Sequence, residues 1–205
     1  FELEAKGGVV VSRADDASLR NFAGHQRNAG VTVHEVNGSE LRELEPHLNT
    51  SITSGIFYPQ DSQCQPMLAA AHLLQAVRNR GGKVLTNAKV LSITRSGERV
   101  SGVETSQGFF HSPIVINATG TWAGEVAKLA GSFLPIAPRR GFILVTAPMP
   151  QIIFHKVYDS DYVANVASGD ADLQTSTVVE GTRSGTILIG ASRERVGFDS
   201  AMRID

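Results

Sequence analysis

Residues 114–124 read IVINATGTWAG, an apolar run followed by small residues and then by a tryptophan. The run at 114–116 predicts a buried strand, and a helix is expected over about 122–129. Small side chains and Gly120 between the two elements leave backbone N–H groups open to an anion. A tight strand-to-helix connection that binds nothing explains this stretch, taken alone, equally well.

The chain before this stretch alternates strands and helices. Strands are predicted at residues 7–12, 31–36, 54–58, 83–86, 90–95, 100–105 and 109–110. Helices are predicted after Asp15 or Asp16 as N-cap, after Ser39 as N-cap, and from Pro66 in a first turn. Residues 96–99 form a tight hairpin turn with a glycine.

The chain after this stretch changes to strands joined by short polar turns. These strands are expected at 136–138, 141–146, 156–158, 162–166, 177–180 and 186–190, and they favour an antiparallel sheet. The fold class predicted for the whole chain is therefore α/β plus antiparallel β.

Composition excludes several classes of protein. The 205 residues carry a formal net charge of -1 and no long basic run, so no nucleic-acid partner is expected. Cys64 is the only cysteine, which excludes an internal disulfide and a cysteine zinc cluster and favours a reducing compartment, the cytoplasm. No apolar run approaches the roughly 18 residues of a membrane span. The start at Phe1 favours a segment of a longer chain, with a processed mature protein as the alternative.

Several catalytic motifs are missing or incomplete. Residues 185–192 come close to a phosphate-binding P-loop but lack its lysine, and their apolar centre predicts a strand. The chain has no G-x-G-x-x-G and no G-x-S-x-G, and its six histidines share no metal-like spacing. Cys64 has no adjacent cation and is expected to be unreactive. No metal site is predicted.

Longer stretches around the opening segment carry a family resemblance. AKVLSITRSGERVSGVETSQGFFHSPIVINATGTWAGEVAKLAG (88–131) resembles the flavoprotein amine oxidoreductases of the D-amino-acid oxidase type. This superfamily includes glycine and sarcosine oxidases and the small subunits of D-amino-acid dehydrogenases. SGIFYPQDSQCQPMLAAAHL (54–73), LPIAPRRGFILVTAP (134–148) and GTILIGASRERVGFD (185–199) resemble further segments of that family in the same order.

The resemblance implies FAD as cofactor and a partial Rossmann-like FAD-binding subdomain at 59–131. The backbone of Val90 would contact the adenine, and Ala118, Thr119, Gly120, Thr121 and Trp122 would form the turn against the dinucleotide. Residues 1–58 and 132–205 would form a mixed or antiparallel substrate-binding subdomain. The implied activity is oxidation of an amine or amino acid by hydride transfer to the flavin, which carries the chemistry.

Two family elements do not occur in these residues: the G-x-G-x-x-G helix and the C-terminal segment that covers the flavin ring. We therefore expect this polypeptide alone to bind FAD weakly or not at all and to be inactive. The alternative is a non-catalytic ligand-binding or subunit-interaction domain with the same fold. An upstream G-x-G-x-x-G in the genomic reading frame would favour the enzyme. A native start codon near Phe1 would favour the non-catalytic domain.

The substrate is not specified by the sequence beyond an amine or amino acid. Candidates that suit a carboxylate-bearing substrate are Tyr58, Arg139, Arg140, Tyr158 and Tyr162. For the two arginines, solvated charges at the rim of a sheet are an equally good interpretation. The whole protein is expected in the cytoplasm, with association to a second subunit or to the inner membrane surface as further expectations.

Overall fold

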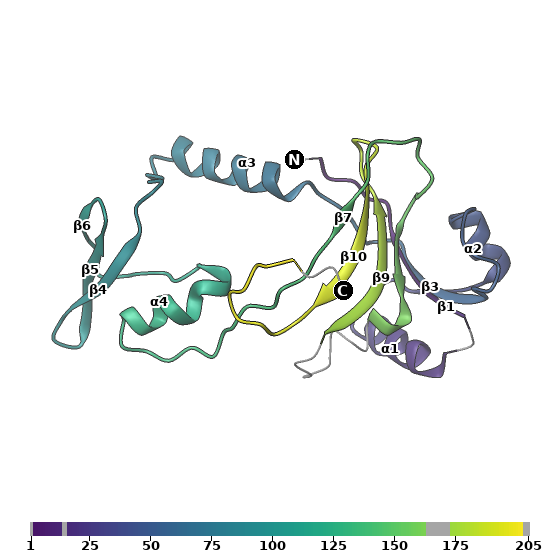
Figure 1. The fold of residues 1–205 in the computed structure, drawn as a ribbon, viewed down its shortest axis with the longest axis horizontal. Coiled ribbons are helices and arrows are strands. Elements are labelled where there is room, and N and C mark those ends of the chain that lie inside the picture. Colours follow the sequence, from purple (N-terminus) through teal and green to yellow (C-terminus); the bar gives the residue numbers. More distant parts are fainter. Residues whose placement is uncertain (1, 14–15, 163–172, 203–205) are drawn as a thin grey trace. The chain divides into compact units, whose positions relative to one another are not determined.

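The computed structural model describes residues 2–13, 16–162 and 173–202. The elements of the first half are β1 (Gly8–Ser12), α1 (Ala17–Asn28), β2 (His34–Asn37), α2 (Gly38–Leu44), β3 (Ser54–Tyr58) and α3 (Pro66–Asn79). The second half contains β4 (Val90–Ser96), β5 (Arg99–Thr105), β6 (Gly108–His111), η1 (Gly120–Trp122), α4 (Ala123–Leu129), β7 (Leu144–Val145), β8 (Lys156–Asp159), β9 (Gln174–Gly181) and β10 (Ile187–Arg193). Figure 1 traces this order along the chain.

The chain divides into two compact units. Unit 1 comprises Phe1–His72 and Gly141–Arg195, and unit 2 comprises Leu73–Arg140 and Val196–Asp205. The helix α3 begins in unit 1 and ends in unit 2. The functional subdomain boundaries expected at residues 58 and 131 stay a prediction.

Unit 1 is built on a seven-stranded mixed sheet with the order β2-β3-β1-β8-β9-β10-β7. The strand β1 pairs antiparallel with β3 and parallel with β8, and the other neighbours are antiparallel. The first and last parts of the sequence therefore share one sheet, and the predicted combination of α/β and antiparallel β structure is confirmed.

Helices α1 and α2 cover opposite faces of the β1 strand because its valines alternate in direction. Val10 packs in one cluster with Leu19 and Ala23 of α1. Val9 and Val11 pack in the other cluster with Leu41 of α2. Figure 1 shows both helices beside β1 and β3.

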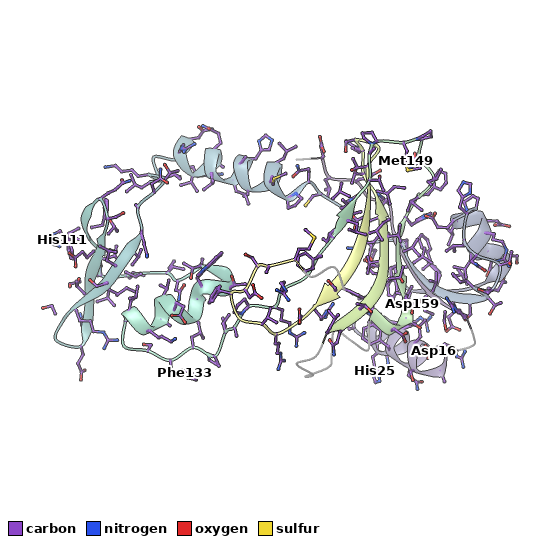
Figure 2. The ribbon with its side chains drawn as sticks, viewed as in Figure 1. Asp16, His25, His111, Phe133, Met149 and Asp159 are labelled. Carbon is purple, nitrogen blue, oxygen red and sulfur yellow. The ribbon has the colours of Figure 1, made fainter. Side chains whose placement is uncertain are left out.

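Both helix starts carry side-chain caps. The Asp16 carboxylate accepts from the N–H groups of Ser18 and Leu19 at 3.0 and 3.1 Å, which confirms one of the two predicted caps. Figure 2 shows Asp16 at this end of α1. The N-cap of α2 is Asn37 rather than the predicted Ser39, because Asn37 and Glu40 form a reciprocal capping box.

Unit 2 holds the three-stranded antiparallel sheet β4-β5-β6 and the helix α4. The predicted hairpin is confirmed, with Ser96 opposite Arg99 across its turn. The guanidinium of Arg95 on β4 donates to the Ala130 carbonyl beyond α4 at 2.6 Å. A side chain at Gly124 of α4 would lie 2.8 Å from the Ile136 carbonyl oxygen, so glycine permits this close backbone approach.

Three predicted strands do not form. At 83–86 the Thr86 carbonyl accepts from the Gln107 side chain at 2.9 Å instead of from a strand. At 136–138 the Ile136 N–H donates back to Leu134 at 2.8 Å and makes a turn. At 114–116 no strand of the described residues pairs with the segment, and the predicted burial is also wrong.

Other predicted boundaries shift by a few residues. The strand predicted at 31–36 begins only at His34, and the strand predicted at 141–146 is regular only at β7. The predictions for 7–12, 54–58, 156–158, 177–180 and 186–190 are confirmed within a few residues by β1, β3, β8, β9 and β10. The strand predicted at 162–166 lies almost wholly outside the described residues.

Candidate functional site

The turn at Asn117–Trp122 is held by its own side chains. Asn117 donates from Nδ2 to the Ala123 carbonyl at 2.9 Å, and its Oδ1 accepts from the Thr119 hydroxyl at 2.7 Å. The N–H of Trp122 donates to the Thr119 carbonyl at 3.1 Å and closes the short helix η1. Asn117 therefore shapes the turn, although the sequence drew attention to the residues after it.

The outer surface of this turn is open. Ala118, Thr119, Gly120, Thr121 and Trp122 are all exposed, and neither η1 nor α4 receives a side-chain N-cap. Gly120 has a φ of +58°, and no atom lies within 4 Å of the position a side chain would take there. An exposed turn of mostly small residues lets a phosphate approach its backbone, so the residues present are compatible with an FAD contact.

Val90 lies elsewhere in unit 2, on the sheet β4-β5-β6. It is the first residue of β4, is half-buried, and pairs with Thr105 of β5. The preceding Lys89 is fixed by Ser106, whose hydroxyl accepts from the Lys89 N–H at 3.0 Å. The backbone at Val90 is thus held by hydrogen bonds to neighbouring segments, and its predicted contact with an adenine stays a prediction.

The three tyrosine candidates lie in unit 1, and Asp61 acts on two of them, Tyr58 and Tyr158. The Tyr158 hydroxyl donates to Asp61 Oδ2 at 3.0 Å, and the Tyr158 ring lies 5.7 Å from the Tyr162 ring. Tyr58 is a buried core residue whose hydroxyl donates to Gln26 of α1 at 2.6 Å. Its position is that of a core residue rather than of a side chain lining a substrate site.

Burial and the Asp61 charge perturb two of these tyrosines. Burial raises the pKa of Tyr58 above its usual 10.0, and the negative charge of Asp61 adds to the effect. Burial also raises the pKa of Tyr158 strongly, and both the charge and the hydrogen bond of Asp61 act in the same direction. Sequence analysis missed Asp61 and Gln26, because nothing in a polar loop or a helix face marks them as partners of tyrosines.

The two arginine candidates differ in their surroundings. Arg139 is exposed. Arg140 is buried, and its Nη1 donates to Asp199 Oδ2 at 2.9 Å and to the Ala201 carbonyl at 2.8 Å. A guanidinium engaged in this way serves the fold of unit 2. Its burial rules out the solvated charge at a sheet rim, and the alternative contact to a substrate stays a prediction. Asp199 was not singled out in the sequence.

Other candidate chemistry is dispersed over the structure. Figure 2 shows His25 on α1 and His111 on β6, in different units. Within the described ranges, no three His, Cys, Asp or Glu side chains are grouped to hold a metal ion. Cys64 is an exposed free cysteine. Among the helices of the described residues, none is long and apolar enough to cross a membrane.

The mixed sheet with its helices and the separate antiparallel sheet match the fold of flavin-dependent oxidoreductases of known structure. The model of the FAD-dependent oxidoreductase (DAO) family matches residues 1–205. The chain therefore belongs to the DAO family of FAD-dependent oxidoreductases, as the resemblance predicted.

Individual relatives agree with this assignment. Hydrogen cyanide synthase subunit HcnC of Pseudomonas aeruginosa is 32% identical over 97% of this chain and 45% of its own length. Human mitochondrial sarcosine dehydrogenase is 32% identical over 57% of this chain and 13% of its own length. The crystal structure of L-proline dehydrogenase from P. horikoshii matches with a TM-score of 0.87 at 22% identity, over 100% of this chain and 53% of its own. The chain thus spans about half the length of HcnC and of this structure.

Proposed function

We propose that these residues belong to an enzyme that oxidises the C–N bond of an amine or amino acid with FAD as cofactor. The observation that carries the proposal is the family match over the full chain. The names of two relatives add sarcosine and L-proline, both of which are secondary amines and amino acids. Each name describes that relative, and the substrate of this protein is inferred from them by analogy.

In this proposal the residues of unit 2 contact the cofactor. The backbone of Val90 and the exposed turn Ala118–Thr121 bind the dinucleotide, and the Trp122 indole flanks it. Flavin, when bound, supplies the chemistry by accepting a hydride from the α-carbon of the substrate. The side chains of this chain bind and orient, and none is required as a general base.

In unit 1 the substrate would lie against the sheet. Tyr162 keeps its candidate role toward a carboxylate in unit 1, and the candidate role of Arg139 is a separate proposal for unit 2. Tyr58, Tyr158 and Arg140 already have partners in the fold, which supports a structural role for these three. We further propose that the 205 residues alone bind FAD weakly, since the turn is open and the sequence has no G-x-G-x-x-G.

The decisive experiment uses the complete product of the gene. The purified protein is expected to show a flavin absorbance spectrum that bleaches anaerobically with an amine or amino acid from a panel of D and L forms. The hydroxy acids in which a hydroxyl replaces the amino group serve as controls and should leave the flavin oxidised. A complete product without flavin would favour the non-catalytic binding domain, and bleaching by the hydroxy acids alone would refute C–N specificity.

The weak FAD binding expected of the isolated 205-residue chain can be tested separately. The isolated chain, purified with excess FAD and then desalted, should retain much less than one flavin per polypeptide. A yellow, stoichiometrically flavinated chain would show that this part of the proposal is wrong.

A further inference from the structure

A short segment of unit 2 contacts the candidate cofactor turn. We call residues 196–202 the strap. Its aromatic residue Phe198 stacks on Trp122, with ring centroids 5.9 Å apart and an interplanar angle of 22°. This geometry lies within the range of favourable aromatic pairs. Both rings remain partly exposed, so the strap covers one side of the indole and leaves other parts of it accessible.

The strap is fixed by Arg140. The Arg140 side chain is only 6% exposed, and its Nη1 reaches both Asp199 Oδ2 and the Ala201 carbonyl. Asp199 uses its second oxygen, Oδ1, to accept from the Ala201 N–H at 2.9 Å. A buried guanidinium is costly unless its charge is compensated, so this arrangement restricts the strap to one position.

The neighbouring Arg139 provides a contrast within the same dipeptide. Arg139 is exposed, whereas Arg140 is buried and donates to the strap. A substrate-binding arginine must present its guanidinium to a ligand, and Arg140 presents it to Asp199 and Ala201 instead. The Arg140 guanidinium therefore contacts the strap, which is the segment that carries Phe198.

We propose that Arg140 is a positioning residue for the cofactor side of the protein. It fixes Asp199 and Ala201, these place Phe198 on Trp122, and Phe198 holds the indole next to the open N–H groups of the turn. The inference rests on the proposed function in one respect only, namely that the ligand of the turn is FAD. Loss of Arg140 then weakens FAD binding, whereas loss of a substrate-binding arginine would raise the KM for substrate.

The first test needs no flavin, because Trp122 is the only tryptophan of the 205 residues. In the 205-residue chain, Arg140→Gln and Asp199→Ala should each red-shift Trp122 emission and increase its quenching by acrylamide, as Phe198→Leu should. The Arg140→Gln/Asp199→Ala double variant should show little more change than either single variant, because both residues act through one contact. Arg140→Lys should restore most of the signal, since an ammonium can donate to the same two oxygens.

Controls separate this effect from unfolding. Arg99→Gln removes the same charge at the exposed hairpin turn of β5 and should leave Trp122 emission unchanged. Far-UV circular dichroism must stay native in each variant. If Arg140→Gln does not fold, Asp199→Ala and Arg140→Lys still test the contact. Unchanged Trp122 emission in folded Asp199→Ala and Phe198→Leu would overturn the proposal.

The second test measures FAD affinity in the complete gene product. Arg140→Gln should raise the Kd for FAD about threefold to tenfold, as expected for one charge-assisted contact, and Arg140→Lys should recover it. The KM for substrate at saturating FAD should stay within a factor of about two of the wild type. A raised KM with unchanged FAD Kd would overturn the positioning role and make Arg140 a substrate residue. Absence of flavin in the wild type would refute the proposed function and the flavin role together, while the Trp122 result would still decide the contact itself.

Discussion

Each of the two units of this protein is stabilised in a different way. Unit 1 buries large apolar side chains on both faces of its sheet, including Val9, Ile56 and Leu41. In the described part of unit 2, the buried apolar side chains are the small Ala123 and Ala127. Large residues such as Ile114 and Ile116 are 73% and 84% exposed there.

Unit 2 depends on hydrogen bonds and close backbone contacts more than on the burial of large apolar side chains. The β4–β5 hairpin and the close approach of Gly124 to Ile136 both depend on main-chain contacts. Burial of apolar surface is the dominant stabilising contribution in folding, whereas each hydrogen bond contributes little net free energy. The free energy of unfolding is therefore expected to reside mostly in unit 1.

The largest expected effect tests this difference with one type of substitution. Ile56→Ala in unit 1 removes a side chain that is 2% exposed and should cost about 2–5 kcal/mol. Ile116→Ala in unit 2 should change stability by no more than about 0.5 kcal/mol. Urea unfolding can follow the units separately, because Trp122 lies in unit 2 and all three tyrosines lie in unit 1.

The same experiment also compares the units in the wild type. Trp122 fluorescence should change at a lower urea concentration than the tyrosine signal, because unit 2 lacks a large buried core. A single coincident transition for both probes, or equal costs for the two isoleucines, would contradict the comparison.

The second expected effect compares carboxylates. Glu45 is 2% exposed, and its Oε1 accepts from the Phe154 N–H at 2.8 Å, from the His155 N–H, and contacts His155 Nδ1 at 3.0 Å. Glu45→Ala leaves these partly buried donors without an acceptor and should cost about 2–3 kcal/mol. Glu45→Gln should cost less, because a single side-chain oxygen makes all three contacts.

The matched substitution in unit 2 is Glu125→Ala. Glu125 pairs with Lys128 at 2.8 Å, but both side chains are more than half exposed, so the loss should stay within about 0.5 kcal/mol. Glu43→Ala, at an exposed position two residues before Glu45, is the control within unit 1. Chemical denaturation of the four variants measures these differences, and a Glu43→Ala cost equal to that of Glu45→Ala would contradict the role of the buried contacts.

Local features of this fold could be predicted from the sequence, and long-range partners could not. The run of three consecutive valines after a glycine turn predicts β1, and the hairpin glycine and the Asp16 cap act within a few residues. Glu45 follows a predicted helix and looks exposed, since its partner His155 lies 110 residues away. Asp61 and Tyr158 are 97 residues apart, so no spacing rule connects them.

The failed strand at 114–116 shows a second limit. An apolar run predicts burial only when another element supplies the opposing surface, and composition carries no information on that element. The residues of the turn after it are exposed, and no atom lies near the side-chain position of Gly120, but whether the turn binds an anion or is only a tight connection stays a prediction. The engagement of Arg140 by Asp199 spans 59 residues and was missed for the same reason as Asp61.

The third expected effect is a pH dependence confined to unit 1. The folded-state pKa values of Tyr58 and Tyr158 lie above the usual 10.0. The neutral tyrosines therefore stabilise the fold fully below about pH 10, and this contribution is lost as the pH rises through the raised values. Unit 1 should lose stability in this alkaline range. The loss should be smaller in the Tyr158→Phe variant than in the wild type.

Urea midpoints at about pH 9 and at about pH 11 measure this loss, with the tyrosine-linked signal reporting on unit 1 and Trp122 on unit 2. Unit 2 contains no tyrosine and supplies the internal control. If Tyr58 and Tyr158 of the native protein ionised near pH 10, as followed by tyrosinate absorbance, their burial and the influence of Asp61 would not be as described.

The smallest expected difference concerns two glycines with similar backbones. Gly7 of unit 1 has a φ of +77° and Gly120 of unit 2 a φ of +58°, so alanine is strained at both by about 1 kcal/mol. A methyl group at Gly7 would also lie 2.6 Å from the Phe57 ring, whereas nothing lies within 4 Å at Gly120. Gly7→Ala should therefore cost about 1 kcal/mol more than Gly120→Ala, because overpacking adds to the backbone strain. Equal costs in urea unfolding would mean that Phe57 moves aside freely, and that unit 1 is less tightly packed at this position than its core.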